Sequence, residues 1–559
     1  MTGMIALPIL CATFVELGWP LKAPVDLSDF DAVEIEYRNT GPLKRPLRAA
    51  VKTARGDAGP VGMHWLGAGE TGVMRVALKT HPWRLDRPLP LKGMQACPQA
   101  HEGLDRVTAI DLFHWPTVKG DGFEVKSLRA VADRGSVALR AATFLPFVDE
   151  YGQFIHADWP GKVGCDGDLK TACERENAEL DAAPRRPFAD ADRFGGFASG
   201  PQLEATGHFR TAKIKGRWWL VDPDGHVFFS HGICCVRSAE ECPTKGRERY
   251  FRGDFPERGD FATSNLKRKH GTSWKDRFAV MAHRRLASWG FNTLAMWSDE
   301  TLGHDRKTPY VVATGTRGPD IPGTGGDWGA IHDPFSREFK DHLERYFAAE
   351  RRNGRAEDPW LIGYFVDNEL PWDALSGDPD RERRYAEEYY RVVSETIRRH
   401  APKKLYLGSR IALGGDGVKR ASARYCDVVS FNVYQTHPEC DLPVGSDDKP
   451  VLIGEFHFGA LGRGLFNTGC VEAENRADAA RRYEMYMDAA LAHPRCVGAH
   501  WFQWRDEPLA GRFDGENYGI GFVSVTDDPY PELVAASRRV ATRLYRNALI
   551  GQRENGETK

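Results

Sequence analysis

Two glutamates in this chain each follow a strongly apolar run, at a point where a buried strand would have to end. The run "LIGYFVDNE" ends at Glu369, and "PVLIGEFHFG" passes from apolar residues to Glu455. A packed strand carries a carboxyl at its terminus only where that terminus faces solvent or a cleft, because burying an unpaired carboxylate is costly. Two carboxyls facing one cleft have the chemistry to split a glycosidic bond. One donates a proton to the leaving oxygen, and the other, ionised, attacks the anomeric carbon or holds the positive charge.

The environments of two such carboxyls decide which one is the acid. A carboxylate near Arg, Tyr or Asn donors stays ionised, whereas a less solvated one keeps its proton. Either glutamate alone is equally well explained as a solvated strand-end residue or as part of a structural ion pair. Their joint position on the fourth and seventh of eight apolar runs, with Asn368 directly before Glu369, favours a catalytic pair.

Other strand ends supply candidates for sugar binding. A tyrosine such as Tyr434 could donate to the ionised carboxyl, and flat indoles could stack on the apolar face of a pyranose ring. Core packing is the alternative for each aromatic in a chain with 15 tryptophans, and a lone histidine such as His231 is more often structural. The candidates are Asn368, His231, Trp297, Asn432, Tyr434, His457, Trp501, Gln503 and Trp504.

Eight apolar runs that alternate with amphipathic helices must position these residues. Continuous apolar strands with helices between them are typical of a parallel sheet covered on its outer face. Eight such units fit a (β/α)8 barrel, whose active site lies at the C-terminal ends of the strands, with the fourth and seventh strands across the mouth from each other. The runs are "VFFSHGICCV", "FNTLAMWS", "PYVVAT", "LIGYFVDNE", "KLYLGSR", "DVVSFNVY", "PVLIGEFHFG" and "VGAHWFQW".

The segment "DRFAVMAHRRLASWG" shows the apolar periodicity of an amphipathic helix most clearly. Its apolar residues recur every three or four positions, and Gly290 follows the last of them, as expected at the C-terminal end of a helix. The segment "DLKTACERENAELDAAP" also predicts a helix, ended by Pro184. The predicted buried face of the first helix consists of Phe278, Met281, Ala282, Leu286 and Trp289.

The first part of the chain has a different pattern. Short, partly alternating segments such as "FDAVEIEYRN" and "TGVMRVALKT" are separated by Gly, Pro, Asn and Asp. This spacing predicts a β-sandwich, and we expect a jelly roll of the kind that accompanies polysaccharide-degrading enzymes. The predicted organisation is therefore a β-sandwich over residues 1–140, a connector over 141–206 and the barrel over 207–559.

Composition and motifs exclude several other classes of protein. The formal net charge is -2, so nothing steers the chain to nucleic acid or to an anionic membrane, and no apolar run is long enough to span a bilayer. There is no Walker A loop, HExxH, strand–GxGxxG–helix unit or GxSxG elbow, and no spacing of His and Asp calls for a metal. We expect no cofactor. Most of the 11 cysteines, which include no CxxC, are expected to be free and buried; Cys165 and Cys173 could pair.

The compartment and the oligomeric state stay open. The apolar start "MTGMIALPILCATFVELGW" has no basic n-region and no clear cleavage site, which favours a buried first strand over a signal peptide. The protein would be periplasmic or secreted if an export signal has been removed, and cytoplasmic otherwise. A homo-oligomer is compatible with the sequence.

The strand-end arrangement resembles the clan of retaining barrel glycosidases in which the acid/base follows an Asn on the fourth strand and the nucleophile lies on the seventh. Longer motifs resemble the β-agarases of glycoside hydrolase family 50: "FVDEYGQFIHADWPGK", "GPQLEATGHFRTAKIKGRWWLVDPDGHVFFSHG", "GYFVDNEL" and "GEFHFGALGRGLFNTG". The resemblance covers about 400 residues and extends to the carbohydrate-binding-module-like domain that precedes the barrel in that family.

The resemblance implies a specific activity and specific roles. Glu369 would be the acid/base and Glu455 the nucleophile, with carboxyls roughly 5 Å apart. The implied reaction is cleavage of β-1,4-galactosidic bonds in agarose or its oligosaccharides with retention, often exo-acting and releasing neoagarobiose. The alternatives are a β-galactosidase or hydrolase of another galactan on the same frame, and a non-catalytic carbohydrate-binding protein.

Overall fold

The computed structural model describes residues 13–41, 45–54, 58–78, 83–87, 89–96, 103–113, 122–132, 137–325 and 329–545. Contacts divide the chain into two compact units, Met1–Phe147 and Val148–Lys559. The beginning of the predicted first strand lies outside the described residues, and β1 is described from Thr13 to Glu16. No helix in the described ranges is both long and apolar enough to cross a membrane.

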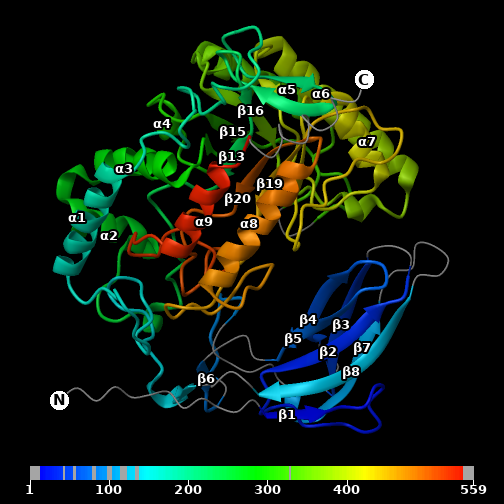
Figure 1. Cartoon of the computed structure of the whole chain (residues 1–559), viewed down its shortest axis with the longest axis vertical. Coiled ribbons are helices and arrows are strands. Elements are labelled where there is room, and N and C mark those ends of the chain that lie inside the picture. Colours follow the sequence, from blue (N-terminus) through cyan, green and yellow to red (C-terminus); the bar gives the residue numbers. More distant parts are fainter. Residues whose placement is uncertain are drawn as a thin grey trace, which may run out of the picture. The chain divides into compact units, whose positions relative to one another are not determined.

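The first unit is built from antiparallel sheets, at the blue end of the colour scale in Figure 1. One sheet has the order β1-β8-β2-β5 and another the order β4-β3-β7. Apolar side chains from both, including Ile35, Val51 and Leu128, belong to one buried cluster. The strands are β2 (Ala32–Asn39), β3 (Arg45–Thr53), β4 (Ala58–Leu66), β5 (Thr71–Ala77), β7 (Val107–Phe113) and β8 (Phe123–Ala132), with a separate parallel pair β6 (Trp83–Leu85) and β9 (Val137–Leu139).

The second unit is centred on an eight-stranded parallel sheet, and each predicted apolar run supplies one strand. Along the sheet the strands follow chain order from β13 to β17, while β20 pairs back with β13. The edge between β17 and β18 is joined by a parallel bridge between Ile411 and Phe431. This is the arrangement of a TIM-like barrel. The strands are β13 (Ser230–Ile233), β14 (Thr293–Leu294), β15 (Tyr310–Thr314), β16 (Leu361–Val366), β17 (Leu405–Tyr406), β18 (Val429–Asn432), β19 (Val451–Phe456) and β20 (Cys496–Trp501).

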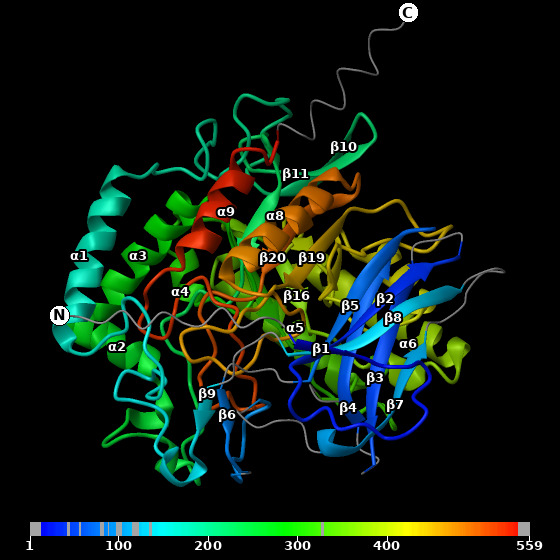
Figure 2. The ribbon, with the colours of Figure 1, turned by 60° about the horizontal axis from the view of Figure 1, so that its bottom comes forward.

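Helices alternate with these strands, as Figures 1 and 2 show for the green to red part of the chain. The connection between β18 and β19, residues 433–450, is described throughout and contains no helix. The helices are α1 (Asp166–Ala182), α2 (Phe261–His270), α3 (Trp274–Trp289), α4 (Glu300–Gly303), α5 (Arg337–Arg352), α6 (Pro379–His400), α7 (Asp416–Tyr425), α8 (Arg476–Ala492) and α9 (Pro531–Ala541).

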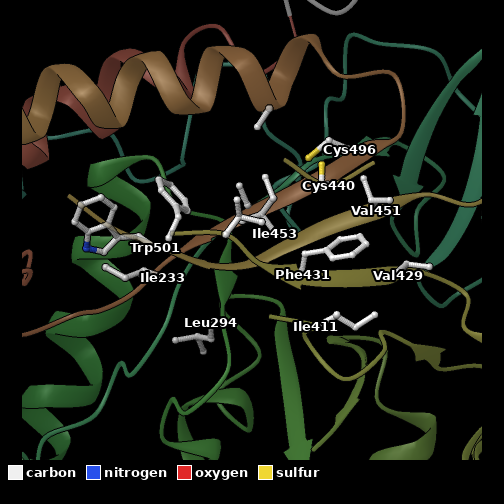
Figure 3. Close-up of a cluster of buried hydrophobic side chains, with 14 of the residues drawn as sticks. Ile233, Leu294, Ile411, Val429, Phe431, Cys440, Val451, Ile453, Cys496 and Trp501 are labelled. Carbon is white, nitrogen blue, oxygen red and sulfur yellow. The ribbon is translucent and has the colours of Figure 1, made fainter. Parts of the chain in front are cut away.

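Helix α3 forms where the apolar period predicts it. All five residues of the predicted face are buried, and Gly290 ends the helix with φ 91°, in the left-handed region that suits glycine. An antiparallel hairpin of β10 (Arg210–Ile214), β11 (Arg217–Val221) and β12 (Val227–Phe228) precedes the barrel. Figure 3 shows the apolar filling that the strands share, with side chains such as Ile233, Phe431, Ile453 and Trp501.

Candidate active site

Glu369 is carried to the end of β16 by a turn that Asp367 holds in place. The half-buried Asp367 carboxylate accepts hydrogen bonds from the Thr316 backbone N–H at 2.7 Å, the Thr316 hydroxyl at 2.8 Å and the Tyr389 hydroxyl at 2.7 Å. These donors lie on the loop after β15 and on α6, so neighbouring elements fix the turn. The first acidic residue of "VDNE" is therefore structural, and the second, Glu369, is half-buried at the strand end.

Glu455 lies near the end of β19 and is surrounded by donors. Arg410 Nη2 is 2.5 Å from Glu455 Oε1, and the Tyr434 hydroxyl donates to Oε2 at 2.5 Å. The Trp297 indole N–H donates to Oε1 at 3.3 Å. These contacts come from the ends of three other strands, and together they place a cation and two further donors on a side chain that is only 5% exposed.

Arg410 is a site residue that the sequence analysis missed. Its guanidinium is fully buried, donates to the Gly454 carbonyl at 2.9 Å, and fills the space beside that glycine. A Cβ on Gly454 would lie 2.6 Å from Arg410 Nε and 2.8 Å from Asn432 Oδ1, so only glycine fits directly before Glu455. The signal was present, since "KLYLGSR" places this arginine after the fifth strand, as the other strand ends place their polar residues.

The two glutamates lie in environments that act differently on their carboxyl groups. Burial and the negative charge of Glu455 raise the pKa of Glu369 to about 7, against the lowering effect of a hydrogen bond from Asn432. Asn432 Nδ2 lies 2.6 Å from Glu369 Oε1 and 3.3 Å from Asn368 Oδ1. Asn432 is also paired with Glu455 in the register of β18 and β19, so the residue that contacts Glu369 lies beside Glu455 in the sheet. The arrangement therefore makes the two carboxyls chemically different, since the pKa of Glu369 is raised while Glu455 is surrounded by donors.

Four residues around this pair have positive φ angles that side chains other than glycine rarely adopt. They are Trp297 at 67°, Asp367 at 60°, Glu369 at 50° and Arg410 at 53°. Each lies just beyond the end of a barrel strand, where the chain turns to bring a side chain to the mouth. Backbone strain of this kind is concentrated at functional sites, because the surrounding structure must hold it.

His457 lies behind Tyr434 and is held as a neutral ring. Its ring centroid is 4.6 Å from that of Tyr434, and it is buried. Nε2 accepts from the Cys470 N–H at 2.9 Å, so the ring proton is on Nδ1, which donates to the Phe502 carbonyl at 3.2 Å. Burial lowers the pKa of His457 to about 3. The structure thus brings His457 to the site as a support for the tyrosine that binds Glu455.

His231 is not brought to the pair as a free ligand group. It is fully buried, Nδ1 lies 2.8 Å from the Gly290 carbonyl, and Nε2 is hydrogen-bonded to the Tyr483 hydroxyl. Both ring nitrogens are therefore occupied, and burial lowers the pKa to about 4. The expected sugar contact is replaced by a structural role between a strand and two helices.

Three candidates from the eighth strand also lie in the interior. The Trp501 indole is fully buried and donates to the Ile520 carbonyl at 2.9 Å. Trp504 is fully buried against Trp289, with ring centroids 5.2 Å apart. Gln503 is likewise fully buried, and its Nε2 donates to a backbone carbonyl two residues further on. Trp501 and Trp504 therefore serve core packing, the alternative that the sequence left open, and neither indole offers a face to a sugar. Among the tryptophans proposed for binding, Trp297 alone is exposed, at 42%.

The loop after β20 contributes a third carboxyl, which the sequence analysis also missed. Glu516 pairs with Arg512 and accepts from the Tyr518 hydroxyl at 3.1 Å. Its charge adds a small upward effect to the pKa of Glu369. On the same loop Phe513 is 74% exposed, and its ring faces the Arg512 guanidinium at 5.5 Å. No sequence signal marked this loop, because it belongs to no periodic element.

One group among the described residues is close enough to hold a metal, and it lies away from the strand ends described above. Asp192, Asp222 and His226 have ligand atoms within 4.8 Å of one another, on the hairpin and the loop before it. Asp192 Oδ2 and His226 Nδ1 form a 2.7 Å hydrogen bond, so these donors already satisfy each other. Neither Glu369 nor Glu455 belongs to the group.

A TIM-like barrel with a carboxyl of raised pKa at the end of its fourth strand and a donor-bound carboxyl on its seventh is typical of glycoside hydrolases that work with two carboxyls. No protein-family model matches the sequence. The chain is 30% identical to a β-agarase B of Vibrio sp. (strain JT0107), over 78% of this chain and 58% of that protein. It is 26% identical to a β-agarase A of the same source, over 93% of this chain and 65% of that protein. The chain thus spans less than two thirds of the length of these curated relatives.

Solved structures agree with the sequence relatives. An exo-β-agarase matches with a TM-score of 0.73 at 24% identity, over 95% of this chain and 93% of that one. An agarase, AgWH50C, matches with a TM-score of 0.73 at 25% identity, over 96% and 93%. The comparisons thus confirm the β-agarase-like resemblance to glycoside hydrolase family 50 that the motifs predicted.

Proposed function

We propose that this protein is a retaining glycoside hydrolase that cleaves β-1,4-galactosidic bonds in agarose or agaro-oligosaccharides. The observation that carries the proposal is that the two strand-end carboxyls lie in different environments, one with a raised pKa and one surrounded by donors. Glu369, with a pKa of about 7, is still about half protonated at neutral pH and largely protonated below it, whereas Arg410, Tyr434 and Trp297 donate to Glu455. The β-agarase names of the relatives support the substrate class.

The proposed reaction has two steps that share one acid. Glu455 attacks the anomeric carbon while Glu369 donates its proton to the leaving oxygen, which gives a glycosyl ester on Glu455 and a free alcohol. Glu369, now ionised, takes a proton from a water molecule that attacks the same carbon, and Glu455 is released as a carboxylate. Two inversions at one carbon give net retention, so the mechanism requires the carboxyls to lie about 5 Å apart.

The surroundings of Glu455 would change during the reaction. Arg410 and Tyr434 stabilise its negative charge, which is lost when the ester forms and returns when the ester is cleaved. The exposed indole of Trp297 touches Glu455 through its N–H, so its face is available to the sugar bound next to the nucleophile. The role of His457 is to hold Tyr434 in place.

The finer parts of the proposal concern the mode of action and the domains. An exo-acting enzyme that releases neoagarobiose is the form we propose, in line with the exo-β-agarase among the structural matches. We also propose that residues 1–140 form a carbohydrate-binding-module-like jelly-roll sandwich, 141–206 a connector and 207–559 the catalytic barrel. The shared core of the two N-terminal sheets supports the sandwich.

A product analysis tests the proposal against its two alternatives. The protein is incubated with agarose, neoagaro-oligosaccharides, porphyran, carrageenan and an aryl β-galactoside, and the first-formed anomer is followed by NMR. We expect neoagarobiose as the product, released first as the β-anomer. Turnover of the aryl galactoside alone would indicate a β-galactosidase. Binding without turnover on every substrate would indicate a non-catalytic carbohydrate-binding protein.

A further inference from the structure

Two cysteine side chains from separate elements meet inside the second unit. Cys440 lies in the connection between β18 and β19, and Cys496 is the first residue of β20. Figure 3 shows their two sulfur atoms side by side. The side chains are hydrogen-bonded to each other, which raises the pKa of Cys440 well above its usual value and lowers that of Cys496. Both residues are buried, at 1% and 0% exposure, and both are free thiols in this structure.

We propose that Cys440 and Cys496 form an intramolecular disulfide when the chain folds in the presence of a small-molecule disulfide such as oxidised glutathione. A disulfide needs two side chains whose Cβ atoms point toward each other and whose sulfurs can approach to about 2.05 Å. The two sulfurs are neighbours in the folded unit (Figure 3), so the fold itself brings the two partners of the bond together. The partners are fixed by a barrel strand on one side and by the connection that leads into β19 on the other.

Forming the disulfide consumes one molecule of oxidised glutathione in two thiol–disulfide exchange steps. The Cys496 thiol loses its proton, and the thiolate attacks one sulfur of oxidised glutathione, which releases one glutathione thiolate and forms a mixed disulfide. The Cys440 thiol then loses its proton and attacks the Cys496 sulfur, expelling the second glutathione. The protein gives up two electrons and two protons, and the oxidant becomes two glutathione thiols. The same balance holds if Cys440 reacts first, since both thiols are reached by the oxidant before they are packed.

Burial determines when this reaction takes place. Neither sulfur is accessible in the folded unit, so exchange with the oxidant occurs before the core around β20 closes. Once formed, the bond is shielded from reductants by the same packing. The loop it closes contains β19 with Glu455 and the whole of α8, and a cross-link over such a loop restricts the unfolded chain. We expect it to stabilise the barrel without contact with the carboxyl pair.

The test compares full-length protein from two bacterial hosts, one with a reducing and one with an oxidising cytoplasm. Each sample is denatured in excess alkylating reagent, reduced, treated with a second reagent and mapped by peptide mass spectrometry. Cys426 is the internal control, since it is equally buried but hydrogen-bonded to the Ser422 hydroxyl rather than to a cysteine. In the oxidising host we expect Cys440 and Cys496 to carry the second reagent and Cys426 the first.

A stability measurement gives a second, independent readout. The oxidised protein should melt about 5 °C higher than the reduced protein. Cys440→Ser should abolish that difference between the hosts, and Cys426→Ser should leave it in place. The proposal is overturned if both cysteines carry the first reagent in folded protein from the oxidising host, or if either is linked to a different cysteine. Neither outcome bears on the hydrolase activity, which uses other residues.

Discussion

The second unit contains two pairs of neighbouring carboxyls in which one member raises the pKa of the other. At the barrel mouth, Glu369 has a pKa raised to about 7 by burial and by the charge of Glu455. On the hairpin, Asp222 has a pKa raised to about 8 by burial and by its hydrogen bond with Asp192. The pKa of Asp192 is lowered despite its burial, because Asp222 and His226 donate to it. Each place therefore contains one carboxyl whose pKa is raised by burial and by a neighbouring carboxyl.

The carboxyl pair on the hairpin and the pair at the barrel mouth differ in their hydrogen-bond donors and in their exposure to solvent. Asp222 Oδ1 accepts from two backbone N–H groups of its own turn, both at 2.9 Å, and the side chain is fully buried. Asp192 accepts two backbone N–H groups in the same way. At the mouth, the donors to the pair are side chains from the ends of three different strands, and both Glu369 and Trp297 are at least partly exposed. A raised pKa alone does not mark an active site; it must coincide with access and with donors gathered from separate elements.

Replacing Glu455 should have the largest effect on activity of any single substitution at the barrel mouth. Glu455→Gln should lower kcat/KM on agaro-oligosaccharides by at least about 10⁴-fold, because the amide cannot form the glycosyl ester. Binding of the substrate, measured by calorimetry, should persist. A variant that folds and retains more than a tenth of the activity would contradict the assignment.

The same chemical change at the two places should give opposite results. Glu369→Gln and Asp222→Asn each replace a protonated carboxyl with a neutral amide. The first should lower kcat/KM about 10²- to 10⁴-fold through loss of the acid, and azide should restore turnover of substrates with activated leaving groups. The second should leave kcat/KM within about twofold, since that pair only closes a turn. Equal losses in both variants would remove the distinction between the two places.

The Asp222 variant also has a stability signature. The folded-state pKa of Asp222 lies above its unfolded value, so its stabilising effect is complete below about pH 4 and is lost as the pH rises toward 8. Asp222→Asn carries no titrating group there, and its Tm should fall less than that of the wild type between these pH values. Thermal melts across that range provide the measurement, and identical slopes would contradict the pKa assignment.

The donors to Glu455 should matter less than the carboxyl itself. Tyr434→Phe keeps the ring against His457 and removes only the hydroxyl that donates to the nucleophile. A hydrogen bond to a charged group contributes about 1.5–3 kcal/mol, so we expect a loss of about 10- to 100-fold in kcat/KM with little change in Tm. An unchanged rate would show that Arg410 alone suffices to keep Glu455 ionised.

The pH profile gives the smallest effect. With a pKa of about 7, Glu369 is protonated below neutral pH, so kcat/KM should fall as the pH rises through 7. Glu516→Gln removes a nearby negative charge, so it should lower the pKa of Glu369 by a fraction of a unit. The alkaline limb of the pH profile, where kcat/KM falls, should then move to lower pH by the same amount. A limb that moves to higher pH would mean that the loop carboxyl does not act on Glu369.

Much of this arrangement could be predicted from the order of residue types along the chain. The eight strands, the apolar face of α3 and the strand-end position of Glu369 and Glu455 follow from periodicity, because packing on a barrel imposes it. The same reasoning could not tell an indole at the mouth from one in the core. Trp297 and Trp501 both follow apolar runs, and only the local backbone turn, with φ 67° at Trp297, decides which is exposed.

Other contacts were beyond sequence reasoning because they join distant elements. Arg410 reaches Glu455 only because Gly454 leaves space for its guanidinium, and neither residue signals the other in the sequence. His231 looked like the other strand-end polar groups, but its partners on helices fill both ring nitrogens. Cys440 and Cys496 belong to no recognisable cysteine motif, and only the packing of the loop on β20 brings them together.

The central claim is that Glu455 bonds covalently to the sugar while Glu369 supplies the proton. The most direct measurement is mass spectrometry of the protein after reaction with a 2-deoxy-2-fluoro galactoside that bears an activated leaving group. The account predicts one added fluoro-sugar per chain, located by peptide mapping on Glu455. A stable label on any other residue, or an inverted first product with no labelled protein, would contradict it.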